Sequence, residues 1–242
     1  MIIKNLFDVV ITSLFPSVCI CCGETLQREE FVCDYCNEMI KRVDFKDYCK
    51  LCGNEKHKGA CKKIYHFENV IAPFYNEDII QKAFYSFKLA HKEYMSRYFA
   101  EEMAKCIKLE YSDIEFDAIT FVPMSFFGKL KKGFNQSEVL ARKIAQILKL
   151  PILPHALVRK SKGKGQHNLD GNERFLNVRG IFGFKHRINC KNILLIDDIK
   201  TTGATLDECA RQLLFAGVHH VYCAAALVTD KKRGKGKEKN GN

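Results

Sequence analysis

Four consecutive aliphatic residues at 193–196 run directly into two aspartates, Asp197 and Asp198. A strand that is apolar on both faces is typical of a parallel sheet covered by helices on both sides. In open sheets of this kind, ligands bind at the carboxyl ends of the strands, which is where the two carboxylates stand. The run therefore predicts an α/β fold with a binding site around residue 197.

The segments around this strand alternate between strand and helix patterns. We expect strands over residues 116–122, 152–158 and 191–198, and helices over 77–108 with a break near His91, over 137–149, and from 205 to Gly217. Asn135 with Glu138, and Thr205 with Glu208, have the spacing of capping boxes, which predicts that a helix begins at each pair.

The loop between the last strand and the last helix, residues 201–205, reads Thr-Thr-Gly-Ala-Thr. It combines three hydroxyls, backbone N–H groups at a helix N-terminus, and a glycine that lets a ligand approach the backbone. Such a loop can bind a phosphate without the lysine of a Walker motif. Asp197 and Asp198 could accept hydrogen bonds from vicinal sugar hydroxyls, or hold Mg²⁺ through water. A ribose 5-phosphate fits both features.

Cysteine is concentrated at the other end of the chain, where eight of the twelve cysteines lie within the first 61 residues. Asp8 interrupts the N-terminal apolar residues and no cleavage site of small residues follows, so we expect an intracellular protein whose thiols bind metal. Cys19, Cys22, Cys33 and Cys36 form two Cys-x2-Cys pairs, which supply four thiolates for one structural zinc ion. A redox dithiol and unliganded cysteines are the alternatives.

A third pair, Cys49 and Cys52, is followed by Cys61, where a fourth cysteine would be expected at residue 64. A second zinc ion would need His57, His66, Cys21 or water as its fourth ligand. Without that ligand, the segment is a turn held by local packing. We expect the Cys-rich head to occupy residues 1–68 and the α/β domain residues 69–229.

The chain carries a formal net charge of +11. Six Lys or Arg and one Glu follow Asp230 in a segment without apolar residues, so we expect residues 230–242 to be a disordered basic tail that contacts polyanions. No stretch is apolar over the length needed to span a bilayer, which favours a cytoplasmic protein. Residues 2–15 should form a short amphipathic helix, or alternatively a peripheral contact at the inner face of the membrane.

Residues 193–205 resemble the phosphoribosyl pyrophosphate (PRPP) signature of type I phosphoribosyltransferases. A Cys-rich zinc head before such a domain is the layout of the ComF family of bacterial competence proteins, and the resemblance covers residues 19–228. It implies a phosphoribosyltransferase-like parallel sheet flanked by helices, with PRPP and Mg²⁺ as ligands. It also implies that the protein handles internalised single-stranded DNA with a competence helicase as partner.

The resemblance also implies roles for individual residues. Asp197 and Asp198 would bind the ribose hydroxyls at the reacting centre, the turn at residues 122–125 would bind pyrophosphate, and residues 159–177 would form a mobile flap. Lys132 stands where an arginine is usual, which keeps the charge but loses bidentate phosphate binding. The residues implied for PRPP are Asp197, Asp198, Thr201, Thr202, Gly203, Ala204, Thr205, Val122, Pro123, Lys132, Arg159, Arg174 and Lys88.

The sequence therefore favours a competence protein that binds single-stranded DNA and retains a PRPP site. Three alternatives stay open: an active phosphoribosyltransferase on an unidentified base or nucleotide, a PRPP sensor without turnover, and a zinc-stabilised scaffold whose transferase fold is vestigial.

Overall fold

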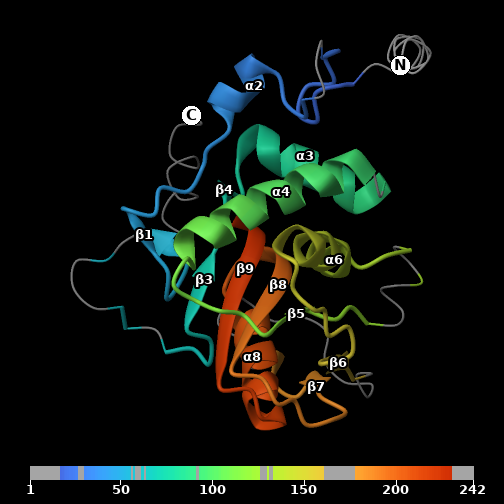
Figure 1. Ribbon diagram of the computed structural model, residues 1–242. Coiled ribbons are helices and arrows are strands. Elements are labelled where there is room, and N and C mark those ends of the chain that lie inside the picture. The colour runs from blue at the N-terminus through green and yellow to red at the C-terminus, as the bar shows by residue number, and fades with distance from the viewer. Residues whose placement is uncertain are drawn as a thin grey trace.

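The body of the protein is a parallel sheet with the strand order β3-β9-β8-β5, and β4 also pairs with β9 (Figure 1). The computed structural model describes residues 17–26, 30–55, 57, 61, 62, 64–90, 93–125, 130, 133–160 and 178–230. The strands are β3 (Asn69–Ile71), β4 (Phe74–Tyr75), β5 (Ala118–Phe121), β8 (Asn192–Lys200) and β9 (His220–Val228).

Helices cover both faces of this sheet. On one face lie α3 (Asp78–Ala90), α4 (Glu93–Glu110) and α6 (Gln136–Leu148), and on the other lies α8 (Ala204–Ala216). Within β8, Leu194 and Ile196 are buried in the cluster of α3, α4 and α6, whereas Ile193 and Leu195 are buried against α8. The prediction of an α/β fold whose central strand is covered on both faces is therefore confirmed.

The helix boundaries follow from local signals, with one correction. The Asn135 side chain accepts a hydrogen bond from Ser137 N and caps α6, as the sequence predicts. The capping box predicted for Thr205 and Glu208 is wrong, because the N-cap of α8 is Gly203, which has a left-handed φ of 83°. Glu208 instead accepts a hydrogen bond from Gly180 N at 3.0 Å and pairs with Arg211 at 2.7 Å.

The strand predicted over residues 152–158 is also wrong. Only Ile152 forms an isolated bridge, to Ile119, and the short strand β6 (Val158–Arg159) pairs with β7 (Phe182–Gly183) in a separate two-stranded sheet. Pro154 within this segment has no N–H to donate to a ladder, which accounts for the irregular backbone. Strand β9, which lies between β3 and β8, is not among the strands predicted from the sequence.

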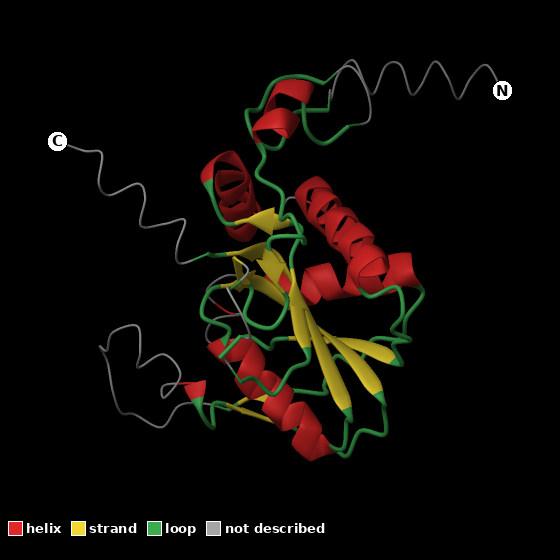
Figure 2. Cartoon of the chain, turned by 90° about the vertical axis from the view of Figure 1, so that its left-hand side faces the viewer, coloured by secondary structure: helices red, strands yellow, loops and turns green. Residues whose placement is uncertain are grey.

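The N-terminal head attaches to the body in two places (Figures 1 and 2). Its first part, with α2 (Asp34–Met39), packs Ile20 and Ile40 into the same cluster as α3 and α4. Its second part is a hairpin of β1 (Tyr48–Cys49) and β2 (Asn54–Glu55), and the Tyr48 hydroxyl donates to Val70 O of β3 at 3.0 Å.

Among the described residues, none of the helices combines the length and the hydropathy that a membrane span requires. The helix expected at residues 2–15 and the basic tail after Asp230 lie outside the described residues. Those two expectations stay predictions, as does the domain boundary at residue 68.

Candidate phosphate loop and zinc centres

Asp197 lies near the end of strand β8, in a buried position beside the N-terminus of α6. Its Oδ1 atom accepts hydrogen bonds from Ser137 Oγ at 3.2 Å and from Asp198 N at 2.9 Å. Burial, together with the neighbouring carboxylate of Asp198, raises the pKa of Asp197 well above its usual value. Asp197 therefore holds a proton more readily than an aspartate in water does.

Asp198 is the more accessible member of the pair, and it is charge-compensated. Lys88 Nζ, from the last turn of α3, lies 2.6 Å from Asp198 Oδ2, and Ile199 N donates to Asp198 Oδ1 at 2.7 Å. The Lys88 carbonyl accepts a hydrogen bond from Gln136 Nε2 at 3.1 Å, which ties α3 to the start of α6. The structure thus brings Lys88 close to both aspartates, although Lys88 and Asp198 are 110 residues apart in sequence.

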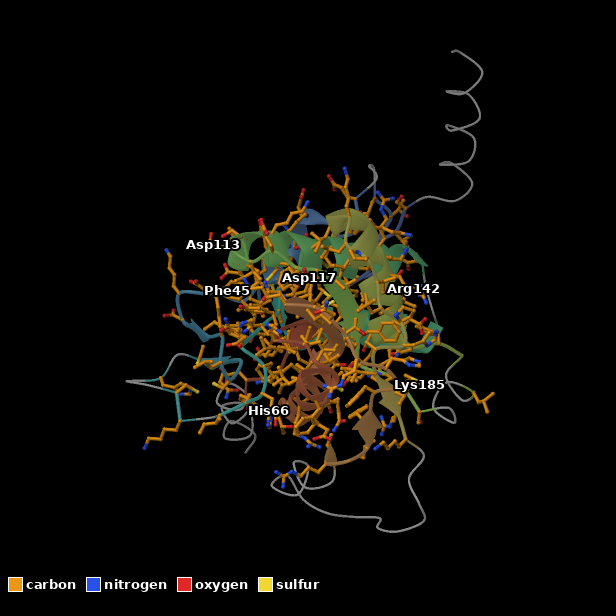
Figure 3. The ribbon with its side chains drawn as sticks, turned by 60° about the horizontal axis from the view of Figure 1, so that its bottom comes forward. Phe45, His66, Asp113, Asp117, Arg142 and Lys185 are labelled. Atoms are coloured by element: carbon orange, nitrogen blue, oxygen red, sulfur yellow. The ribbon has the colours of Figure 1, made fainter. Side chains whose placement is uncertain are left out.

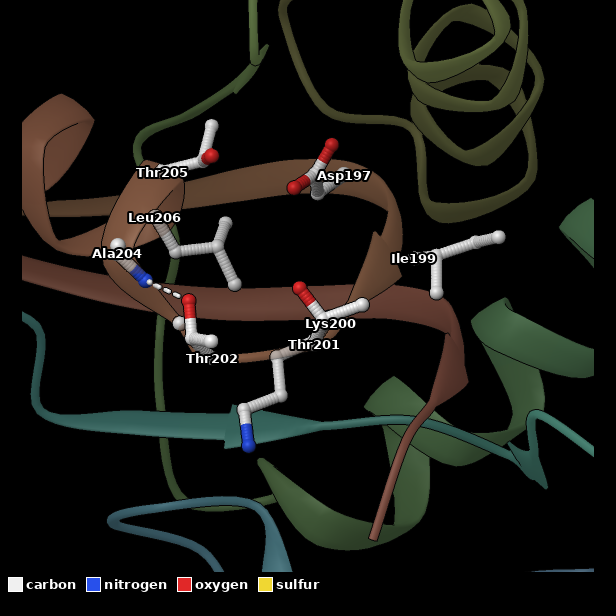
Figure 4. Close-up of a pocket in the computed structure, with 9 residues that line it drawn as sticks. Asp197, Ile199, Lys200, Thr201, Thr202, Ala204, Thr205 and Leu206 are labelled. Atoms are coloured by element: carbon white, nitrogen blue, oxygen red, sulfur yellow. Dashed lines mark hydrogen bonds between the residues drawn. The ribbon is translucent and has the colours of Figure 1, made fainter. Parts of the chain in front are cut away.

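The loop after β8 encloses a small pocket at the N-terminus of α8 (Figure 4). Thr202 is buried, and its Oγ1 accepts a hydrogen bond from Ala204 N at 3.3 Å, which holds the turn in shape. Gly203 takes the left-handed conformation that lets the chain enter the helix. The pocket is lined by Asp197, Ile199, Lys200, Thr201, Thr202, Gly203, Ala204, Thr205 and Leu206.

This arrangement suits an anion. The first N–H groups of a helix lack intrahelical partners, and the helix dipole favours negative charge at this end. Threonine hydroxyls add further donors, and the aspartates stand on the strand that leads into the loop. A phosphate at the loop would therefore leave an attached sugar close to the carboxylates.

Of the other residues implied for PRPP, some lie beside the aspartates and others do not. Val122 follows β5 and its N–H donates to Ile196 O at 2.9 Å, so the turn that begins with Val122 and Pro123 lies beside Asp197. Arg159 lies on the β6–β7 sheet, with its guanidinium carbon 5.6 Å from the centre of the Phe182 ring. Lys132 and Arg174 lie outside the described residues.

The first cysteine cluster has the chemistry of a zinc site. One ligand atom from each of Cys19, Cys22, Cys33 and Cys36 lies within 4.8 Å of the others. Burial disfavours the thiolate of Cys19, but N–H groups of Cys22, Cys33 and Cys21 outweigh it and lower the pKa of this thiol to about 6. Four sulfurs that converge in this way fit a tetrahedral zinc ion.

The second cluster consists of Cys49, Cys52, Cys61 and His57, again with all ligand atoms within 4.8 Å. Cys52 Sγ and His57 Nε2 are 3.1 Å apart. Of the candidates for the fourth ligand, His57 is therefore the one at this site, whereas His66 hydrogen-bonds to Asp207 Oδ1 with its Nδ1 at 3.0 Å, beside α8 (Figure 3). Three sulfurs and one imidazole are a common donor set for structural zinc.

Sequence reasoning missed two residues at the phosphate loop, Lys200 and Tyr65. Each joins the loop to the head: Tyr65 Oη donates to Thr202 O at 3.1 Å, and Lys200 Nζ, from the start of the loop, donates to the carbonyls of Cys52 and Gly53. The sequence offered one signal for Lys200: a lysine at the end of a buried strand needs hydrogen-bond acceptors close to it, because a buried ammonium is unstable without them.

The chain is similar to known proteins both in its head and along most of its length. Residues 10–65 match the family model of the double zinc ribbon domain. Competence protein F of Haemophilus influenzae is 24% identical over 226 residues, which is 86% of this chain and 96% of that protein. Competence protein ComFC of Bacillus subtilis is 29% identical over 79% of this chain and 81% of its own length. The DNA utilization protein YhgH of Escherichia coli is 30% identical over 42% of this chain and 44% of its own length.

Solved structures were also matched. Adenine phosphoribosyltransferase aligns over 63% of this chain and 79% of its own, with 13% identity and a TM-score of 0.38. The glutamine PRPP amidotransferase of B. subtilis, complexed with ADP and GMP, aligns over 54% of this chain and 26% of its own, with 18% identity and a TM-score of 0.35. The chain is therefore similar along most of its length to competence proteins F and ComFC, and its head, with the converging cysteines, matches a double zinc ribbon.

Proposed function

We propose that the protein binds PRPP at the loop of residues 201–205 and acts in the handling of DNA taken up during natural transformation. The observation that carries the PRPP proposal is the order along β8 and α8: two aspartates, then hydroxyls and a left-handed glycine at a helix N-terminus. On one continuous segment, this order supplies carboxylates that can accept hydrogen bonds from sugar hydroxyls and N–H and O–H groups that can donate to a phosphate.

In this proposal each described residue has a distinct part. The N–H groups and hydroxyls of the loop bind the 5′-phosphate, and Asp198, held by Lys88, accepts hydrogen bonds from ribose hydroxyls. Asp197 supports Asp198 through the backbone hydrogen bond between them. Mg²⁺ bound with PRPP would supply positive charge to the pyrophosphate group, so the chain itself has mainly to position its ligand.

The proposed role in DNA handling is supported by two relatives that align over 86% and 79% of the chain and are named as competence proteins, and by YhgH, which is named as a DNA utilization protein. The net charge of +11 suits a polyanion. Among the described residues, Lys185, Arg187 and Lys191 lie on the exposed connection into β8 and offer phosphate contacts. A competence helicase remains the proposed protein partner.

The PRPP proposal is tested by calorimetric titration of PRPP with Mg²⁺ against wild type and the double variant Asp197→Ala/Asp198→Ala. The double variant should lose measurable binding. Asp113→Ala/Glu115→Ala removes the same charge from two exposed positions and should bind as wild type. Equal binding by wild type and the Asp197/Asp198 variant would remove the site assignment.

The DNA proposal is tested by measuring single-strand affinity from about 50 to 200 mM salt. Phosphate contacts release counterions, so affinity should fall steeply with salt, and an affinity independent of salt would contradict the proposal. The second candidate function, an active phosphoribosyltransferase, is favoured by the intact pair of aspartates beside the loop. Release of pyrophosphate from PRPP in the presence of candidate bases or nucleotides separates this candidate from binding without turnover.

A further inference from the structure

Lys200 connects the phosphate loop to the second cysteine cluster. It is the last residue of β8 and precedes Thr201, yet its side chain runs away from the loop hydroxyls towards the head (Figure 4). Only 1% of Lys200 is exposed. Its Nζ donates to the carbonyl oxygen of Cys52 and, at 3.3 Å, to that of Gly53. An ammonium buried to this degree is stable only while such acceptors are in place.

Those acceptors belong to the turn that presents the second set of metal ligands. Cys52 N and Gly53 N both donate to Cys49 O, at 3.2 and 2.7 Å, and this closes a turn between the first two ligands. The carbonyl groups at the end of this turn are the ones that accept from Lys200. Gly53 has a left-handed φ of 65°, and a Cβ atom on it would lie 2.8 Å from Lys200 Nζ. The Lys200 side chain therefore occupies the space that a side chain at residue 53 would fill. In this one turn the sulfurs face the metal site, whereas the carbonyls accept hydrogen bonds from Lys200.

The residues after the last cysteine of the cluster hold the other side of the same loop. Tyr65, four residues beyond Cys61, donates to Thr202 O at 3.1 Å, and its ring stacks on Phe67 with centroids 4.6 Å apart. His66 N donates to Asp207 Oδ1 at 2.6 Å, in the first turn of α8. The loop is thus held from residue 200 to residue 207 by the segment that contains the cluster.

The first cluster makes contacts of another kind and serves as an internal control. Near it, Phe31 packs on Tyr98 of α4 with ring centroids 5.7 Å apart, and Ile20 is buried in the core beneath α3 and α4. Among the described residues, Cys19, Cys22, Cys33 and Cys36 form hydrogen bonds with one another and with neighbours in the head.

We propose that the site formed by Cys49, Cys52, His57 and Cys61 supports the phosphate loop, with Lys200 and Tyr65 as positioning residues. A segment this short has little core of its own, so metal binding supplies its folding energy. If the segment unfolds, Lys200 and Thr202 lose their partners and the loop loses its shape. Because coupling between two binding sites is reciprocal, PRPP must in turn raise the affinity of this site for metal, and we expect metal loss to slow as a result. The inference rests on the proposed binding of PRPP.

A matched pair of tyrosine variants tests the positioning role. Tyr65→Phe removes the hydroxyl that donates to Thr202 O, and Tyr48→Phe removes a head hydroxyl that donates to Val70 O, away from the loop. Each variant loses one hydrogen bond between head and body. We expect Tyr65→Phe to weaken PRPP binding about fivefold and Tyr48→Phe to leave it within error of wild type. Equal PRPP affinities for the two variants would overturn the inference.

Lys200→Met tests the link to the metal, since it keeps most of the aliphatic stem and removes the ammonium. Hydrogen bonds from a charged donor are the stronger kind, so PRPP affinity should fall on the order of 10- to 100-fold. The independent readout is the rate at which a chromophoric chelator extracts zinc. In wild type, PRPP should slow extraction of one of two zinc ions about tenfold, and in Lys200→Met this protection should disappear.

The outcomes distinguish this inference from the function on which it rests. Wild type that binds no PRPP refutes the proposed function and the inference together. Wild type that binds PRPP, but releases both zinc ions at rates independent of PRPP, overturns the inference alone. Should Lys200→Met fail to fold, the chelator assay on Tyr65→Phe decides: PRPP protection that is reduced supports the coupling, and protection equal to that of Tyr48→Phe contradicts it.

Discussion

Replacing Gly203 by alanine tests whether the phosphate loop has its shape because the head packs against it. Gly203 has a φ of 83°, and a Cβ atom added to it would lie 3.3 Å from Cε1 and 3.4 Å from Oη of Tyr65. The Tyr65 ring is fixed by its stacking on Phe67 and by its hydrogen bond to Thr202 O, so it cannot move aside freely.

Two terms set the expected size of the effect. A non-glycine residue in the left-handed region costs about 1–2 kcal/mol. Crowding against a ring that must shift by a few tenths of an ångström adds about 1–2 kcal/mol. The sum, about 2–4 kcal/mol, corresponds to a fall in Tm of about 4–16 °C for a protein of this size. We expect PRPP affinity to fall on the order of tenfold, because the displaced backbone N–H groups are the proposed phosphate donors.

The assay is thermal unfolding in the presence of zinc, followed by PRPP titration at a temperature where the variant is folded. Gly180→Ala is the matched control: Gly180 has a φ of 76° and nothing within 4 Å of its added Cβ, so this variant carries the backbone cost without the contact. In a double-mutant cycle with Tyr65→Leu, the contact should reappear as a coupling energy of about 1–2 kcal/mol. Equal Tm losses for Gly203→Ala and Gly180→Ala, with no coupling to Tyr65, would refute the reasoning.

Three further predictions concern the buried carboxylate, the second metal site and the tail. Burial raises the pKa of Asp197, so the unfolded carboxyl ionises near pH 3.9 while the folded one keeps its proton; the contribution of this group to stability is greatest below about pH 4 and is lost as pH rises towards the folded pKa. Asp197→Asn keeps an acceptor for Ser137 and should therefore be stabilised relative to wild type in chemical denaturation between about pH 5 and 8, most strongly at the upper end, and parallel pH profiles would contradict this. His57→Ala should lose one of two zinc ions to a chelator under reducing conditions while Cys21→Ser, outside both clusters, keeps two, and a His57→Ala protein that retains both ions would exclude His57 as a ligand. Truncation after Asp230 removes six Lys or Arg, so the salt dependence of single-strand binding should become shallower by up to about 4 units of log K per log salt, and an unchanged slope would show that the tail does not contact the strand.

The elements that sequence reasoning predicted are those whose pattern is local. The aliphatic run of β8 and the amphipathic pattern of α6 indicate which of their residues are buried. Both elements begin and end within one or two residues of the predicted bounds. Strand β9 was missed because its centre, residues 224–226, is three alanines, which favour helix by propensity. In the sheet, these small side chains are buried between neighbours, an environment that the sequence alone does not specify.

The candidate site shows the same division. The aspartates and the threonine-rich loop are contiguous, so their chemistry could be read from the sequence. The hydrogen bonds that join Tyr65 to Thr202 and Lys200 to Cys52 span 137 and 148 residues, and no local pattern encodes such pairs. His57 was one of several possible ligands until the fold brought it to three sulfurs.

The position of β9 has a consequence for how the chain is made. Among the described residues it is the last strand in sequence and pairs with β3, β4 and β8, so in that part of the chain β3 and one edge of β8 wait for this partner until residues 220–228 have left the ribosome. The head can fold around zinc much earlier in synthesis. A nascent chain that stops short of His220 would therefore carry a folded zinc-binding head beside strand edges that β9 has not yet covered, and such edges favour aggregation.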